Sequence, residues 1–409
     1  MAMLKQGFSY AFILGRQPAL GAVELQNYLT AQDLTFEYSG QFKDALVLSF
    51  AKELDDVRKI QNELGGVVKI VQIIDEAREA GQIINLLSPA RLAKTYFAQT
   101  KSKINFGISW HGNFLNQQHK RELKNLGLKI KKQLKDNFSL RVVETKTNSL
   151  TSVQVAKNKL VESGAEIVII KTINTFLVGK TLSVQDFEKY SKRDFGKPSP
   201  DAKSGMLPPK LAQMLINLTR DKKTETVFDP FVGSGIVLQE AMLMGLKSAG
   251  TDIENSATEN TKNNLRWLMS EFGINHKYYI GIKKQDATRA TWPEMNKNDT
   301  IIVTEPYMGP PQGRIMNPEK AKKIAMELRA LYLRFFENLA TNFGEIENIC
   351  FVTPIFKTTS GEITPEIIDE IAKLGYTRKV FKTHLPLTDL VYARDDQVVK
   401  RQINILRRN

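Results

Sequence analysis

Two short segments in the second half of the chain combine residue types that could do chemistry. The first is Asp229-Pro-Phe-Val-Gly-Ser-Gly235, which follows the apolar run 226–228 and precedes the helix-like stretch 236–244. A strand, a glycine turn and a helix in this order bring backbone amides close to a small ligand. The amino end of the helix carries a partial positive charge, which suits a carboxylate. We therefore expect a ligand cradle at this turn.

The second segment is Thr304-Glu-Pro-Tyr307, at the end of the apolar run 301–303. In an open α/β sheet, ligands bind beyond the carboxyl ends of the strands. The amino group of a purine is a poor nucleophile because its lone pair is delocalised into the ring. Glu305 and the carbonyl of Pro306 could accept hydrogen bonds from such a group, and Tyr307 could stack on the base. We predict these three residues as catalytic; the alternative is a buried strand end with a turn proline and a packed tyrosine.

Acidic residues after three successive predicted strands extend the cradle. Asp229 could accept from an ammonium group, and Asp252 stands where dinucleotide-binding sheets place the acid that holds ribose hydroxyls. Asp286 and the amide of Ala287 could bind an adenine amino group. The predicted cofactor-binding residues are Asp229, Pro230, Phe231, Gly233, Ser234, Gly235, Asp252, Ile253, Asp286 and Ala287.

These features favour S-adenosylmethionine as the cofactor, and methyl transfer to an exocyclic amino group as the reaction. A nicotinamide cofactor is the competing ligand, but it would prefer a Gly-x-Gly-x-x-Gly spacing, and Leu238 stands at the third glycine position. The structural alternative is a helix-start turn with surface acids.

The composition of the chain is that of a folded protein and indicates which partners and sites to expect. With 409 residues, 42% of them hydrophobic and 25% charged, the chain can build two or three folded domains. A net charge of +14 favours an anionic partner such as nucleic acid over a basic enzyme without a polyanion partner. No apolar run approaches the roughly 18 residues of a membrane span, and the first residues do not resemble a secretory signal. One cysteine, Cys350, and four scattered histidines argue against disulfides and metal sites, so we expect a cytoplasmic protein without structural metal.

Hydrophobic patterns divide the chain into four parts. Residues 1–80 alternate short strands and helices in a β-α-β-β-α-β order, which predicts a ferredoxin-like domain. Residues 81–186 form a second α+β domain, and 187–222 contain a linker and the first helix of the next domain. Residues 223–409 alternate strands and helices, which predicts a mostly parallel, doubly wound sheet whose last strand adds antiparallel.

The second part carries two basic helical segments that could contact RNA phosphates. The first, 119–136, has an apolar stripe with lysines on its other faces, and the second is 152–162. The alternative is an ordinary solvated helix face. In the second segment, the candidate RNA-binding positions are 156 and 158. The sequence has Ala156 and Asn158 there, and the neighbouring lysines are Lys157 and Lys159. The other candidate RNA-binding residues are Lys120, Arg121, Lys124, Lys131 and Arg193.

Longer motifs resemble the tRNA guanosine-N2-methyltransferases that carry a ferredoxin-like module, a THUMP domain and a Rossmann-type class I catalytic domain. The resemblance runs nearly end to end and rests on Phe12-Ile-Leu-Gly-Arg16, Gly205-Met-Leu-Pro-Pro-Lys-Leu-Ala-Gln213 and the 229–235 segment. It implies S-adenosylmethionine as methyl donor, the guanosine at position 10 of tRNA as target, and a THUMP domain that grips the acceptor end. One departure stands out, because the family usually has Asp-Pro-Pro-Tyr where this chain has Thr304-Glu-Pro-Tyr307. We favour Glu305 as the functional acid.

The sequence thus predicts a tRNA methyltransferase that makes N2-methylguanosine on a flipped-out base. Two alternatives stay open: methylation of another RNA or tRNA site, and a non-catalytic RNA-binding protein with a decayed methyltransferase domain. A monomer and a complex with an accessory subunit are both compatible with the sequence.

Overall fold

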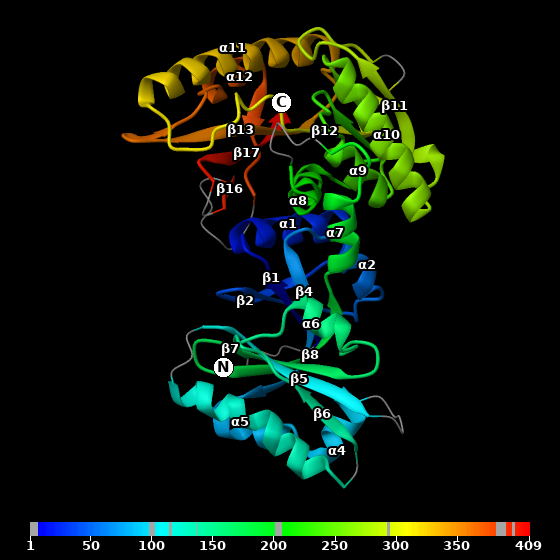
Figure 1. Cartoon of the computed structure of the whole chain (residues 1–409), viewed down its shortest axis with the longest axis vertical. Coiled ribbons are helices and arrows are strands. Elements are labelled where there is room, and N and C mark those ends of the chain that lie inside the picture. Colours follow the sequence, from blue (N-terminus) through cyan, green and yellow to red (C-terminus); the bar gives the residue numbers. More distant parts are fainter. Residues whose placement is uncertain are drawn as a thin grey trace. The chain divides into compact units, whose positions relative to one another are not determined.

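The computed structural model describes residues 7–97, 103–113, 117–136, 138–200, 207–292, 295–381, 390–394 and 397–409. The chain divides into two compact units, each containing one sheet (Figure 1). The first unit comprises Met1–Ala22 and Leu34–Glu188, and the second comprises Val23–Asp33 and Lys189–Asn409. None of the helices in this described part of the chain is both long and apolar enough to cross a membrane.

The first unit is built on an eight-stranded sheet in the order β2-β3-β1-β4-β8-β7-β5-β6. Its strands are β1 (Phe8–Leu14), β2 (Glu37–Phe42), β3 (Ala45–Phe50), β4 (Val67–Ala77), β5 (Ile104–Gly112), β6 (Leu140–Val143), β7 (Ala165–Lys171) and β8 (Phe176–Val184). β5 runs parallel to β6 and β7, and the other neighbours are antiparallel. Because β4 pairs with β8, the two segments that we predicted as separate domains share one sheet.

The helices of this part of the chain are α1 (Pro18–Ala31), α2 (Val57–Asn62), α3 (Ala80–Leu86), α4 (Pro89–Arg91), the π-helical turn η1 (Leu92–Tyr96), α5 (Gln117–Leu134) and α6 (Ser152–Lys157). On α5 the predicted apolar stripe is buried at Leu126, Ile130 and Leu134, which pack in the core that contains Phe106 of β5. α6 is shorter than the predicted helix 152–162. It ends because the backbone reaches a left-handed conformation at Lys159, with φ of 53°.

A buried ion pair ties the middle strands of this sheet together. Lys69 of β4 donates to Glu166 of β7 and to the carbonyl of Leu150 at 2.7 Å. The same carboxylate accepts from Ser109 of β5 at 2.5 Å and from Thr181 of β8 at 2.6 Å. The charge is therefore fully hydrogen-bonded, as a buried charge must be.

The second unit is built on a nine-stranded sheet with the main order β11-β10-β9-β12-β13-β17-β15. Its strands are β9 (Thr226–Asp229), β10 (Lys247–Asp252), β11 (Tyr279–Lys284), β12 (Thr300–Thr304), β13 (Asn348–Thr358), β14 (Gly361–Ile363), β15 (Tyr376–Arg378), β16 (Leu390–Tyr392) and β17 (Val399–Arg408). β11, β10, β9, β12 and β13 are parallel, and β17 is antiparallel to β13. The predicted parallel sheet with an antiparallel last strand is confirmed. β15 is antiparallel to β17.

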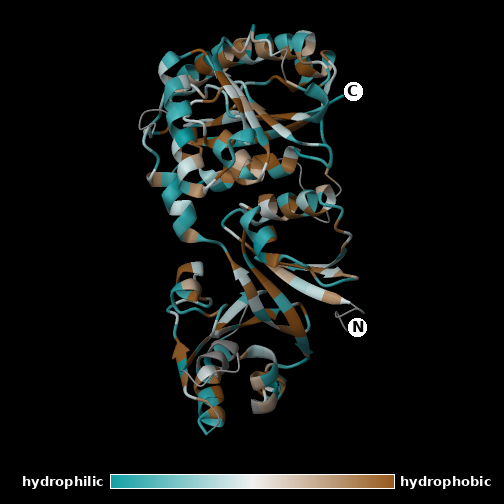
Figure 2. Cartoon of the chain, turned by 90° about the vertical axis from the view of Figure 1, so that its right-hand side faces the viewer, coloured by the Kyte–Doolittle hydropathy of each residue, from teal (hydrophilic) through white to brown (hydrophobic). Residues whose placement is uncertain are grey.

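Six helices belong to the described residues from 187 to 373. They are α7 (Phe187–Phe195), α8 (Pro209–Thr219), α9 (Ile236–Leu243), α10 (Asn255–Phe272), α11 (Pro318–Asn342) and α12 (Ile368–Lys373), with short 3-10 turns at His276–Tyr278 and Lys297–Asp299. In Figure 1, α11 and α12 lie on the opposite side of the strands from α8 and α9. Figure 2 shows hydrophobic stretches along the strands and alternating colours along the helices, as expected where one helix face meets a sheet.

α11 presents an aromatic face to the sheet. Tyr332, Phe335 and Phe336 are buried, and all three contact the ring of Phe351 on β13. Phe335 also contacts Phe231, which follows β9. This packing fixes the carboxyl end of β9 and the first half of β13 relative to α11.

The first prediction concerns Lys69 in the first unit. Lys69→Met leaves the buried Glu166 charge without its cation, so we expect the free energy of unfolding to fall by about 3–5 kcal/mol. Urea denaturation followed by circular dichroism measures it. Lys222→Met is the control, since its ion pair with Asp33 is exposed and its loss should leave the unfolding curve unchanged. Equal effects of the two substitutions would contradict the role of the buried pair.

Candidate functional site

The glycine turn after β9 has the backbone conformation that the sequence predicts. Gly233 and Gly235 have φ of 50° and 80°, in the left-handed region, and Gly235 is the N-cap of α9. Thr261 of α10 supports the turn by donating to the carbonyl of Gly233 at 2.8 Å. A Cβ at Gly235 would lie 2.8 Å from the Thr261 methyl group, whereas a Cβ at Gly233 would meet no atom within 4 Å. The turn is therefore closed behind Gly235 and open in front of Gly233.

A cavity of about 700 Å³ lies in front of this turn. It is lined by Asp229, Pro230, Phe231, Gly233, Ser234, Asp252, Ile253, Asp286 and Ala287, and also by Glu305, Pro306 and Tyr307. The structure thus brings the two predicted segments to one cavity at the carboxyl ends of β9, β10, β11 and β12. Among the predicted cofactor residues, Gly235 lies behind this wall.

Other lining residues were not predicted: Leu207, Val232, Ile236, Val237, Glu254, Ala257, Met308, Gly309, Pro311 and Leu331. Several of these are neighbours of predicted residues, so the strand ends alone could have indicated them. Leu207 before α8 and Leu331 on α11 carry no such signal, because only the packed fold brings them to the cavity.

Asp229 is the most buried acid of the site, at 2% exposure. Its Oδ1 accepts from the amide of Phe231 at 3.0 Å and from the Thr304 hydroxyl at 2.7 Å. Burial is the main cause that raises the pKa of Asp229 to about 7, and the two hydrogen bonds oppose the shift. The hydrogen bond from Thr304 directly joins the end of β9 to the end of β12.

The two other predicted acids are tied to local backbone amides. Asp252 accepts from the amides of Gly233 and Glu254, each at 3.0 Å, and burial raises its pKa. It therefore fixes the glycine turn as well as lining the cavity. Asp286 accepts from the amide of Thr288 at 2.9 Å and from its hydroxyl at 2.8 Å, which holds the turn after β11.

In the segment Thr304–Tyr307, the carboxylate of Glu305 is held by an ion pair and the ring of Tyr307 is exposed. Glu305 forms a two-point ion pair with Arg401 of β17, and Nη2 of Arg401 lies 3.0 Å from Oε1. Tyr307 is 56% exposed, so its ring is accessible, and its carbonyl accepts from the Tyr332 hydroxyl at 2.7 Å. This arrangement offers an anchored carboxylate and an exposed aromatic face at the cavity.

The prediction that Arg193 binds RNA is wrong. Arg193 lies on α7, is 6% exposed and donates to Glu240 at 2.7 Å. Its guanidinium also lies 4.2 Å from the ring centroid of Tyr190. Reaching RNA would leave the buried Glu240 unpaired, so Arg193 is part of the packing of the second unit. The segment predicted as a linker therefore begins as a packed helix.

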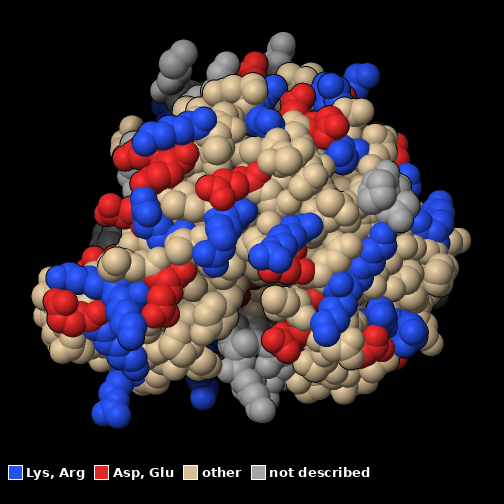
Figure 3. Space-filling view, turned by 90° about the horizontal axis from the view of Figure 1, so that it is seen from above, with Lys and Arg blue, Asp and Glu red and all other residues tan. Residues whose placement is uncertain are grey.

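The other basic candidates have a different status. Arg121 and Lys131 of α5 are exposed, as are Lys157 and Lys159 near α6. The side chains of Lys120 and Lys124 lie outside the described residues. Over the second unit, Figure 3 shows Lys and Arg interspersed with Asp and Glu on the face toward the viewer, so that face carries no patch of a single sign.

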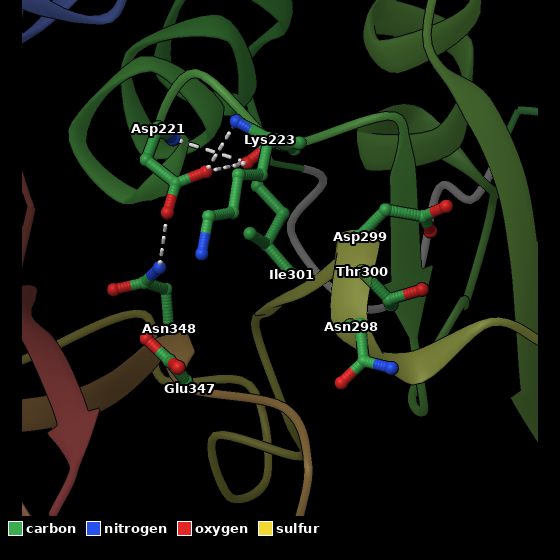
Figure 4. A pocket seen from close by; sticks show the side chains of 9 residues that line it. Asp221, Lys223, Asn298, Asp299, Thr300, Ile301, Glu347 and Asn348 are labelled. Atoms are coloured by element: carbon green, nitrogen blue, oxygen red, sulfur yellow. Dashed lines mark hydrogen bonds between the residues drawn. The ribbon is translucent and has the colours of Figure 1, made fainter.

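A small polar pocket lies at the opposite edge of the second sheet, at the amino ends of β12 and β13 (Figure 4). Its volume of about 20 Å³ suits one water molecule. Asp221 in its wall already accepts from the amide of Lys223 at 3.0 Å, from Thr224 at 2.9 Å and from Asn348 at 3.1 Å. These bonds cap a turn, and we assign this pocket no chemistry.

The raised pKa of Asp229 makes stability depend on pH. The folded state holds the Asp229 proton more tightly than the unfolded chain, so this group stabilises the fold fully below pH 3.8 and that contribution is lost as pH rises to about 7. Asp229→Asn keeps an acceptor for Phe231 and Thr304 without a charge. We expect the unfolding free energy of the variant, relative to wild type, to rise by a few kcal/mol, on the order of the shift, between pH 5 and pH 8.

Urea titrations at the two pH values measure the Asp229 effect. The control is Asp369→Asn, an exposed substitution on α12 that should follow the wild-type pH dependence. A constant difference between Asp229→Asn and wild type would contradict the burial of an ionisable Asp229.

The two glycines of the turn should respond unequally to alanine. Both substitutions force a side chain into the left-handed region, at a cost of about 1–2 kcal/mol. Gly235→Ala adds the close contact with Thr261, so it should lower the midpoint of thermal unfolding further than Gly233→Ala does. Differential scanning calorimetry measures both, and the opposite order would show that Thr261 does not close the turn.

Two protein families and several named proteins are similar to parts of this chain. The RMKL-like methyltransferase domain family matches residues 197–358, and a DNA methylase family matches residues 88–263. The tRNA (guanine(10)-N2)-dimethyltransferase of Pyrococcus abyssi is 35% identical over 142 residues, covering 35% of this chain and 39% of that protein. The enzyme of the same name from Methanocaldococcus jannaschii is 30% identical over 200 residues, covering 46% of this chain and 54% of that protein.

The fold also matches solved structures over almost the whole chain. TrmN from Thermus thermophilus is similar with a TM-score of 0.55 and 14% identity, covering 98% of this chain and 99% of that one. SMU.472, a putative methyltransferase complexed with SAH, has a TM-score of 0.51 and 12% identity, covering 99% of each chain. At these identities the likeness establishes an α/β methyltransferase-like fold with mixed sheets.

The sequence matches cover about half, or less, of the length of the two archaeal relatives. Both relatives nevertheless have the same name. The matched methyltransferase-domain family covers the glycine turn and the segment Thr304–Tyr307. Parts of the chain are therefore similar to tRNA guanine-N2 methyltransferases, and residues 197–358 match a family of methyltransferase domains.

Proposed function

We propose that this chain is an S-adenosylmethionine-dependent tRNA methyltransferase that modifies the exocyclic N2 of a guanosine, at position 10 of tRNA. The observation that carries the proposal is a single cavity lined both by the glycine turn and by Glu305, Pro306 and Tyr307. The names of the relatives support the choice of tRNA and of the guanine amino group.

The residues present fit the proposed cofactor. The open space in front of Gly233 lets a ligand approach the backbone closely, and the amides at the start of α9 suit its carboxylate. Asp252 and Asp286 keep carboxylate oxygens at the cavity, where they suit ribose hydroxyls and an adenine amino group. The exposed side chain of Ile253 offers an apolar surface beside them. Bound there, S-adenosylmethionine would supply an electrophilic methyl group on a sulfonium.

The chain's own residues then act on the base. Glu305 and the carbonyl of Pro306 accept hydrogen bonds from the target amino group, which localises its lone pair toward the methyl group. The exposed Tyr307 ring stacks on the base and orients it. Methylation would make the target nitrogen cationic, and its extra proton would leave to solvent. Alignment and exclusion of water supply most of the rate.

We assign RNA recognition to the first unit. In this proposal residues 1–80 form a ferredoxin-like domain, 81–186 a THUMP domain, 187–222 the connection and 223–409 the methyltransferase domain. The exposed Arg121 and Lys131 of α5 would contact phosphates, since basic side chains on one helix supply sequence-independent affinity. The cytoplasm is the expected compartment for an enzyme that acts on tRNA.

A second candidate is an RNA-binding protein whose methyltransferase domain is inactive. The observation that favours it is the altered motif, since Thr304 stands at the usual acid position and Glu305 is engaged by Arg401. The intact glycine turn and the large cavity favour catalysis.

One experiment separates the two candidates. Purified protein is incubated with labelled S-adenosylmethionine and unmodified tRNA, and the oligonucleotides from a ribonuclease digest of the tRNA are analysed by mass spectrometry. We expect N2-methylated guanosine at position 10, and a loss of about 100-fold or more in rate for Glu305→Ala, because the amino group loses its main acceptor. The exposed Glu327→Ala on α11 is the control. Calorimetric binding of the cofactor without any methylated product would favour the non-catalytic candidate, and an unchanged rate for Glu305→Ala would contradict the catalytic role of Glu305.

A further inference from the structure

The carboxylate of Glu305 is held by a guanidinium that reaches it from the last strand of the chain. Nη2 of Arg401 donates to Oε1 at 3.0 Å, and Nε donates to Oε2. The side chains of Arg401 and Glu305 are 10% and 14% exposed, so most of the pair is withdrawn from solvent. A fork of two parallel hydrogen bonds fixes the plane of a carboxylate as well as its position.

The sheet explains how these distant residues meet. β13 lies between β12 and β17, and Phe351 of β13 is in register with Thr304 on one side and Asn404 on the other. Arg401 is in register with Pro354, further toward the carboxyl end of β13. The long side chain therefore reaches across β13 to the residue that follows β12. On its other side, β17 pairs with β16, where Tyr392 is in register with Arg401.

Arg401 stands behind the carboxylate and not in the cavity. Glu305 lines the cavity, whereas Arg401 is not among the described residues that do so. Each carboxylate oxygen has more than one lone pair, so Glu305 can accept from a bound amino group while both oxygens are held by Arg401. The guanidinium thus fixes the acceptor from the rear and leaves its front available.

An ion pair at this place is poorly explained by stability alone. The attraction between two buried charges is little larger than the free energy needed to remove them from water. Apolar side chains of similar volume often stabilise a fold equally well. A carboxylate that must face a ligand at a defined angle has the opposite requirement, because a misplacement of about 1 Å can cost a hundredfold in rate. The pair lies where that requirement applies, at the wall of the cavity.

We propose that Arg401 is a positioning residue for methyl transfer, which holds the Glu305 carboxylate in the orientation that accepts from the target amino group. This role rests on the proposed function. Arg401 touches neither the base nor the methyl donor and acts through Glu305. It also accounts for the altered motif, because a longer acid placed one position later needs an external anchor to face the cavity.

The test compares wild type with Arg401→Gln, Arg401→Lys, Glu305→Gln and the double variant Arg401→Gln/Glu305→Gln. We measure kcat, KM for tRNA and calorimetric affinity for S-adenosylmethionine. Arg401→Gln should lower kcat about 10- to 100-fold and leave KM and cofactor affinity within about twofold. Arg401→Lys should recover part of the rate, since it keeps the charge but not the fork. The double variant should be no slower than Glu305→Gln alone.

The matched control is Arg407→Gln on the same strand. Arg407 also pairs with a glutamate, Glu347, but at 3.5 Å and with side chains 64% and 57% exposed, so its loss should leave kcat unchanged. If Arg401→Gln does not fold, the kcat of Arg401→Lys is compared with that of Arg407→Lys, and only the former should be lowered. The double variant Arg401→Gln/Glu305→Gln is a further safeguard, because it leaves no buried charge unpaired.

Three outcomes overturn the role of Arg401. A wild-type kcat in Arg401→Gln overturns it, and so does a double variant whose losses multiply, because Arg401 would then act independently of Glu305. A purified wild type that methylates no tRNA overturns the proposed function and this role together. In the first two outcomes the wild type is active, so they overturn only the role of Arg401.

Discussion

The hydrogen bond from Thr304 to Asp229 is the constraint on which the site depends. β9 and β12 are adjacent parallel strands, so their last residues lie side by side at the carboxyl edge of the sheet. The bond of 2.7 Å joins the segment that forms the glycine turn to the segment that carries Glu305 and Tyr307. Because Asp229 is buried, it needs donors, and Thr304 supplies one without a second negative charge. The relative placement of the two halves of the cavity follows from this contact.

The hydrogen bond between Thr304 and Asp229 also explains why threonine suits position 304 of the altered motif. An aspartate at position 304 would place a second carboxylate against Asp229, and one of the two would have to hold a proton. This chain has threonine there and an acid one position later, where Arg401 meets it. The negative charge is thus moved from a place where it would face another acid to a place where it faces a cation.

The sequence predicts those parts of the fold that depend on local order along the chain. The parallel strands of the second sheet and its glycine turn follow from apolar runs that end in glycine or acid, and the structure confirms them. β8 was not predicted because polar residues interrupt its apolar pattern. Its pairing with β4 is long-range, and this pairing joins the two predicted domains in one sheet.

Within the site, the limit of sequence reasoning lies at contacts made across strands. Glu305 and Tyr307 could be chosen because they end a strand, but Arg401 lies 96 residues later and reaches Glu305 only through the register of β17 on β13. Arg193 shows the converse error, since a basic residue in a polar segment suggested a surface role. Its partner Glu240 lies on α9, and nothing local in the sequence connects the two.

The boundary between the two units also depends on contacts between residues that are distant in the sequence. Residues 23–33, which fall in the predicted ferredoxin-like domain, belong to the second unit. Asn27 of this stretch donates to the carbonyls of Asn217 and Arg220 at 2.6 and 3.1 Å, at the end of α8, and Glu24 accepts from Asn217 at 2.8 Å. The last carbonyls of a helix need partners that the helix itself cannot provide. A cut at residue 189 would remove these partners from α8, so the second unit needs residues 23–33 to satisfy the end of this helix.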